Sequence, residues 1–131
     1  MKVKYPKKIN NNLIKSFFIN ISLKNLINDS KRRTLGVNEK MKKQILPYKA
    51  ELNDLYRLYK FITLNKRLCV LEFGCGNSSI IINKALDFNK KNFFKGVEKI
   101  RQHNKFKHFS VDNDKNYLRL IKKKIPKNNI S

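Results

Sequence analysis

Six residues in the second half of this 131-residue chain are of the types that form ligand sites. They occur in the segments LEFGCGNSS, residues 71–79, and SVDND, residues 110–114. The glycines of the first segment permit a tight turn and a close approach of backbone to ligand, because they carry no Cβ. The acidic residue of the second segment can accept hydrogen bonds from both hydroxyls of a ribose. The candidate site residues are Glu72, Gly74, Cys75, Gly76, Asp112 and Asn113.

Two classes of nucleotide ligand fit these segments. The dinucleotide fingerprint G-x-G-x-x-G is incomplete, because Ser79 stands where its third glycine would be. Glu72 lies two residues before the first glycine, where a carboxylate would repel a pyrophosphate. A carboxylate there suits a cationic ligand better. S-adenosylmethionine carries a sulfonium and an ammonium group, and it also has a ribose that Asp112 could bind.

The elements around these residues predict an α/β fold. The apolar run at 68–73 is short and contains valine and leucine, which is typical of a strand buried in a parallel sheet. A helix capped by Ser78 or Ser79 should follow and end near Phe88. After an insert at 89–107, we expect a second strand at about 108–112. A last helix should then run to the residue before Pro126.

VLEFGCGNSS resembles motif I of the class I (Rossmann-like) S-adenosylmethionine-dependent methyltransferases, and SVDND resembles their motif II. In that family the motif I loop wraps the methionine part of the cofactor, and the motif II carboxylate binds the ribose. The resemblance implies an S-adenosylmethionine-binding segment. It makes Asp112 the ribose ligand, places Asn113 beside the adenine, and leaves Asp114 as a second candidate for the ribose. Its implied loop contacts are Glu72, Gly74, Cys75 and Gly76.

The resemblance covers only residues 47–125, roughly. The family sheet has seven strands, whereas this chain supplies two, so its Rossmann-like unit is incomplete. We therefore expect a truncated reading frame, a fragment, or half of a split enzyme whose complementary C-terminal half is another chain. Little or no activity is expected from this chain alone. The substrate and catalytic residues of the family lie beyond the matching part, so the catalytic residues and the methyl acceptor remain unknown.

The sequence divides the chain into two parts that differ in charge, apolar spacing and motifs. Residues 1–46 form a basic extension in which the apolar spacing over 10–29 predicts one bent helix or two short ones. Residues 47–131 form the methyltransferase-like segment. It opens with a helix after Pro47 whose apolar residues fall on one face. This helix should cover the sheet.

The charge supports an alternative function. The chain has 31 Lys and Arg against 9 Asp and Glu, a net charge of +22. Segment 89–107 adds Phe93, Phe94 and Phe106 to its basic residues, a mixture that can bind single-stranded nucleic acid. The alternative is therefore a basic nucleic-acid-binding module, such as part of an RNA methyltransferase. The chain is also rich in Asn, which gives no electrostatic advantage, so we favour compositional bias as the origin of the charge.

Cysteine and histidine give no metal-site pattern. Cys69 and Cys75 are six residues apart without a CxxC motif, and we expect no carboxylate near His103 or His108. Reduced cysteines and the lack of a run of about 18 apolar residues predict a soluble, cytoplasmic protein without a membrane span.

Overall fold

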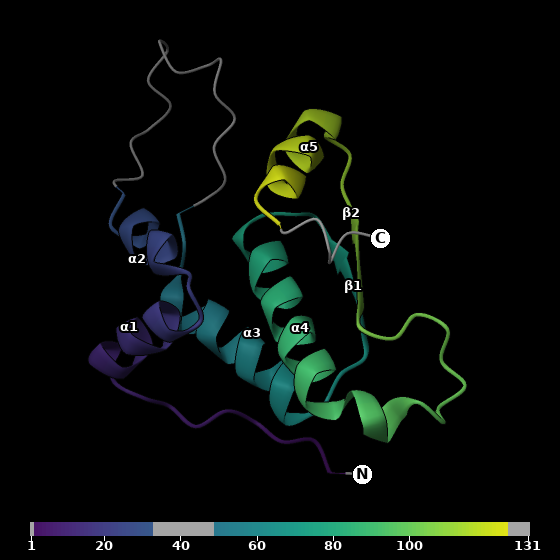
Figure 1. Cartoon of the computed structure of the whole chain (residues 1–131). Helices are drawn as coiled ribbons and strands as arrows, with labels where there is room; N and C mark the ends of the chain where they lie inside the picture. Colours follow the sequence, from purple (N-terminus) through teal and green to yellow (C-terminus); the bar gives the residue numbers. More distant parts are fainter. Residues whose placement is uncertain (1, 33–48, 126–131) are drawn as a thin grey trace.

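The computed structural model describes residues 2–32 and 49–125 and contains a parallel pair of strands with helices packed against it (Figure 1). Its elements are α1 (Asn11–Asn20), α2 (Lys24–Ser30), α3 (Leu52–Leu64), β1 (Cys69–Phe73), α4 (Asn77–Val97), β2 (Lys107–Val111) and α5 (Lys115–Lys123). The register pairs Cys69 with Lys107 and Phe73 with Val111. The predicted mixed α/β fold with two parallel strands is thereby confirmed. None of the helices in these described ranges is long and apolar enough to cross a membrane.

A single apolar core joins the N-terminal helices to the helices beside the sheet. Phe18 of α1 and Ile81 of α4 are both fully buried in it. The core also takes in the apolar face of α3, including Leu55, as the residue spacing predicts. Helices α1 and α2 therefore pack on the same core as α4, which contacts both strands. Helix α3, which was expected to cover the sheet, packs mainly against α4. The predicted boundary between residues 46 and 47 lies outside the described residues.

Helix α4 is longer than the sequence pattern indicates. It continues past its predicted end at Phe88 and ends at Val97, so the first part of the expected insert at 89–107 is helical. Contacts made by this extra length explain the difference. Asn89 is completely buried, and the ring of Phe93 packs edge-on against Phe88.

Asn89 connects α4 to the segment that leads from α3 into β1. Its Nδ2 donates to the carbonyl oxygen of Ile62 at 3.2 Å and to that of Arg67 at 2.9 Å. The Arg67 N–H also donates to the Ile62 carbonyl at 3.0 Å. These bonds satisfy backbone acceptors at the end of a helix, where no intrahelical donor is available. The side chain thus fixes where β1 begins relative to α4.

We predict that Asn89→Ala lowers the free energy of unfolding by about 2 kcal/mol, because the Arg67 carbonyl oxygen loses its side-chain donor and the Ile62 carbonyl oxygen loses one of its two donors. Urea unfolding followed by circular dichroism measures the change. Asn92→Ala is the matched control. Asn92 is exposed and donates only to the Phe88 carbonyl of its own helix, so its effect should stay within about 0.5 kcal/mol. Equal losses in the two variants would contradict this role for Asn89.

Candidate functional site

The two predicted motifs meet at the carboxyl ends of the parallel strands. The Gly74 N–H donates to the Val111 carbonyl oxygen at 2.7 Å, which continues the strand pairing into the turn. The next N–H, that of Cys75, donates to Oδ2 of Asp112 at 3.0 Å. The glycine turn and the acidic residue predicted to serve one ligand are therefore in direct contact. Parallel strands bring such residues together because their carboxyl ends lie at the same edge of the sheet.

Asp112 is held as a carboxylate at this edge. Its Oδ1 accepts the Asp114 N–H at 2.9 Å, and this bond, with those from Cys75, lowers the pKa of Asp112 below its ordinary value. Oδ1 retains a lone pair for a ligand, whereas Oδ2 also accepts the Cys75 thiol at 3.4 Å. Asn113 is exposed beside it. Asp114, the second candidate for the ribose, is the N-cap of α5 and accepts two backbone N–H groups of that helix.

The glycine turn has one position that requires glycine. Gly74 has φ +88°, in the left-handed region, and a Cβ added there would meet no atom within 4 Å. Gly76 is the N-cap of α4, two or three residues before the predicted cap at Ser78 or Ser79, and the helix begins at Asn77. The space above Gly74 is open to a ligand, and the first N–H groups of α4 follow directly.

Cys75 lies in the turn but is a poor nucleophile. Burial, together with the hydrogen bond and negative charge of Asp112, raises the pKa of its thiol to about 12. Its Sγ lies 3.4 Å from Oδ2 of that carboxylate. A thiol is reactive as the thiolate, which this environment opposes. Cys75 therefore contributes its backbone N–H to the turn.

Glu72 points under the turn and binds four side-chain donors. Ser79 and Ser110 each donate a hydroxyl to its Oε2 at 2.6 Å, and Nε2 of His108 lies 3.0 Å from the same oxygen. Ser78 donates to Oε1. The Glu72 side chain is only 12% exposed. A carboxylate surrounded in this way joins β1, β2 and the first turn of α4.

This network changes the interpretation of Glu72. Burial alone would raise its pKa, but the hydrogen bonds from His108 and the three serines outweigh burial and lower the pKa from 4.5 to about 2. Hydrogen-bond donors of the protein itself therefore stabilise the negative charge of Glu72. Glu72 was predicted to contact the cofactor, and the structure places it beneath the turn, where it supports the loop.

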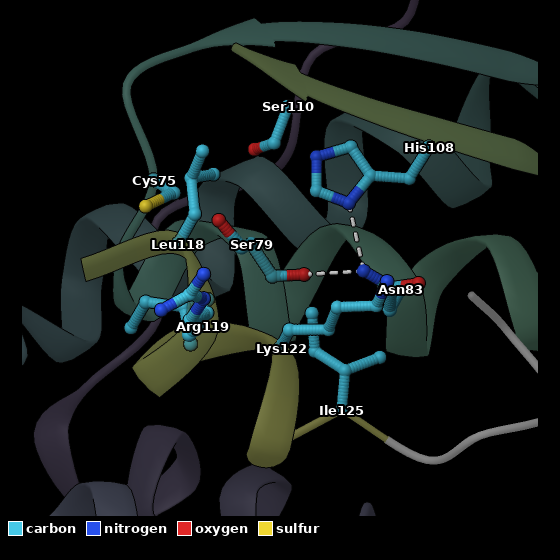
Figure 2. Close-up of a pocket in the computed structure, with 10 residues that line it drawn as sticks. Cys75, Ser79, Asn83, His108, Ser110, Leu118, Arg119, Lys122 and Ile125 are labelled. Atoms are coloured by element: carbon cyan, nitrogen blue, oxygen red, sulfur yellow. Dashed lines mark hydrogen bonds between the residues drawn. The ribbon is translucent and has the colours of Figure 1, made fainter. Parts of the chain in front are cut away.

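The expectation that His108 has no carboxylate partner is wrong. Val70 pairs with His108 in the sheet, so Glu72, two residues further along β1, lies on the same face and within reach of the ring. The Nδ1 of His108 lies 2.7 Å from the Asn83 amide nitrogen, which also donates to the Ser79 carbonyl (Figure 2). Nδ1 is therefore the acceptor and Nε2–H the donor to Glu72.

The sequence did not reveal that three serines and His108 bind Glu72. For His108 and Ser110, the available signal is the two-residue alternation of a strand, which puts both on one face. That signal becomes useful only when the register between the two strands is known. Within 2–32 and 49–125, no three His, Cys, Asp or Glu side chains gather closely enough to hold a metal ion.

Two cavities border the turn. A cavity of about 250 Å³ lies between the turn and the start of α3 and is lined by Asp54, Tyr117, and Glu51 with its ion-pair partner Lys49 at 3.9 Å. A second cavity, of about 290 Å³, lies between the inner face of β2, α4 and α5 (Figure 2). The polar wall of the second cavity consists largely of the donors and acceptors of the Glu72 network. Its opposite wall comes from α5 and includes Leu118 and Ile121.

In the basic segment after Phe88, Phe93 and Phe106 are partly buried and Phe94 is exposed. The Lys66 ammonium lies 4.7 Å from the centre of the Phe93 ring. Phe94 is 48% exposed, and its ring lies 6.5 Å from that of Phe106. Binding of nucleic acid by this segment stays a prediction.

Comparison of the chain with protein-family models, with curated proteins and with solved structures found no match.

We predict that Gly74→Ala destabilises the chain by about 1 kcal/mol, since a residue with a Cβ is strained at positive φ. Gly96→Ala is the matched control, and it should change the free energy of unfolding in the opposite direction. Gly96 lies within α4, and a Cβ there meets no atom within 4 Å, so alanine should stabilise the helix by about 0.5–1 kcal/mol. Thermal and urea unfolding measure both changes. Stabilisation by both substitutions would contradict the conformation of the turn.

We also predict that the Glu72 network contributes to stability in a pH-dependent way. Because the pKa falls from 4.5 to about 2 on folding, the contribution is fully present above pH 4.5 and is lost as the pH falls from 4.5 to about 2. Allowing for solvent screening, the loss is about 2 kcal/mol. Glu72→Gln should remove this part of the pH dependence, whereas Glu98→Gln, on the exposed turn after α4, should keep it. Parallel curves of unfolding free energy against pH for wild type and Glu72→Gln would disprove the assignment.

Proposed function

We propose that the chain binds S-adenosylmethionine at the turn between β1 and α4 and is the cofactor-binding part of a methyltransferase. The observation that carries the proposal is the contact between the two motifs, in which the Cys75 N–H donates to Asp112 at 3.0 Å. One ligand could therefore reach the glycine turn and the acidic residue together. The resemblance of both segments to motifs I and II supports the same ligand.

The ribose end of the cofactor fits the position of Asp112. The carboxylate stands at the strand edge with its charge stabilised and with a lone pair left on Oδ1, while the second contact at Oδ2 is the Cys75 thiol, a weak donor. A ribose diol offers two hydroxyl donors, and charge-assisted bonds to a carboxylate are the stronger kind. Asn113 is exposed next to this point, where the adenine would lie.

The methionine end fits the open side of the turn. Absence of a Cβ at Gly74 leaves the backbone accessible, and the adjoining cavity of about 250 Å³ contains the carboxylates of Glu51 and Asp54. Asp54 suits a ligand with a sulfonium and an ammonium, since opposite charges attract, whereas Glu51 is paired with Lys49. Glu72 would act from below by fixing the turn. The cofactor, when bound, supplies an electrophilic methyl group.

This part of the proposal covers binding only. No residue of the chain is assigned to the methyl acceptor or to proton transfer. In a complete enzyme those groups would come from a complementary segment, and the role of Asp112 and the glycine turn would be to hold the cofactor in line with the acceptor. Orientation of this kind supplies much of the rate acceleration in group transfer.

We predict saturable binding of S-adenosylmethionine and S-adenosylhomocysteine to the whole chain in isothermal titration calorimetry. Asp112→Asn should weaken binding at least tenfold, because the ribose loses a charged acceptor worth about 1.5–3 kcal/mol. NAD should not compete, since Ser79 stands in place of the third glycine of the dinucleotide fingerprint. The matched control is Asp87→Asn on α4. The Asp87 carboxylate lies away from the turn and pairs with the Lys91 ammonium at 2.8 Å, so this substitution should leave cofactor binding unchanged.

Two outcomes would count against the proposed function. One is the absence of saturable binding to wild-type protein that circular dichroism shows to be folded. The other is equal affinity of wild type and Asp112→Asn for S-adenosylhomocysteine.

A further inference from the structure

The two faces of the sheet differ sharply. Inward-facing Val70, Glu72, His108 and Ser110 are largely covered, and α4 contacts both strands on that side. The labelled helices all lie on this one side of the strands in Figure 1. Strands of parallel sheets are usually covered on both faces, since the connecting helices pack against each side. The opposite face is therefore the exception in this fold.

Four apolar side chains form the opposite face, which we call the outer apolar patch. Leu71 is 57% exposed, Phe73 82%, Phe109 39% and Val111 54%. The register sets Leu71 beside Phe109 and Phe73 beside Val111, so the four make one continuous surface. They expose on the order of 400 Å² of apolar area, because a large aromatic side chain alone presents about 150–250 Å². Patches of this size on a single chain commonly mark interaction sites.

We propose that the outer apolar patch is the docking surface for an acidic protein partner that presents the apolar face of an amphipathic helix. A helix is the appropriate element because the inner face of the same strands is covered by a helix, α4. A helix lying on a sheet buries a stripe of apolar side chains at three- and four-residue spacing. This inference does not depend on cofactor binding at the turn.

Charge selects the class of partner. Each copy of the chain carries +22, so the association of two copies through this face is opposed by repulsion. Lys107 lies two residues before Phe109 on β2 and so on the same face, at the amino end of the patch. A partner with acidic residues flanking its apolar stripe would be attracted by the net charge of the chain and could pair with Lys107. Charge complementarity of this kind also speeds encounter.

The test uses two fluorescent peptides of about 20 residues with the same composition of leucine and glutamate. In one, leucines follow the i, i+3, i+4, i+7 spacing of an amphipathic helix; in the other, they are scrambled so that no apolar face forms. Fluorescence anisotropy with the whole chain should give at least tenfold tighter binding of the amphipathic peptide. Phe73→Ser should abolish this preference, and Phe94→Ser should retain it, since Phe94 is similarly apolar but lies on α4.

Several results would overturn the proposal. Equal binding of both peptides would mean that charge alone is recognised, and an unchanged preference in Phe73→Ser would place the site elsewhere. Sedimentation equilibrium that shows a dimer in wild type and a monomer in Phe73→Ser would assign the patch to a second copy. Val111→Ser provides a second variant of the patch should Phe73→Ser fail to fold. Calorimetry with S-adenosylhomocysteine on Phe73→Ser separates this surface from the turn, because cofactor binding should persist.

Discussion

The carboxylate of Glu72 is the interaction on which the rest of the site depends. It receives donors from β2 and from the first turn of α4 while it belongs to β1 itself. A buried carboxylate is costly unless its hydrogen-bonding capacity is filled, and here the serines and His108 fill it. Two strands distant in sequence and the helix that follows the first of them are thereby held at one point, directly below the glycine turn.

The geometry of the turn follows from that anchor. With β1, β2 and α4 held together, Gly74 continues the strand pairing and the Cys75 N–H faces Asp112. Glu72 below the turn and Asp112 beside it thus have different roles. Glu72 is satisfied by protein donors and supports the loop, whereas Asp112 is positioned at the strand edge with capacity left for a ligand. The two carboxylates, which look equivalent in sequence, are separated by their surroundings.

Local patterns in the sequence predicted the elements of this site well. The apolar run at 68–73 and the alternation near Phe109 correspond closely to β1 and β2, and the turn and Asp112 lie together as expected. These features depend on strand propensity and on the edge that parallel strands share, and both can be read from nearby residues.

What the sequence could not show depends on distant contacts. The extension of α4 to Val97 is stabilised by burial of Asn89 against the end of α3, which no local pattern reveals. The pairing of Glu72 with His108 requires the register of two strands separated by a long helix. The same register creates the outer apolar patch, because alternate residues of both strands point away from α4.

The central claim is that the glycine turn and Asp112 form one binding site for S-adenosylmethionine. Its most direct test is a titration of the isotopically labelled chain with S-adenosylhomocysteine, followed by amide chemical shifts in NMR spectra. We expect small changes along α1 and α2 and saturable shifts at Gly74, Cys75, Gly76, Asp112 and Asn113. Shifts confined to the cavity between α4 and α5, or the absence of any saturable shift in the folded chain, would contradict it.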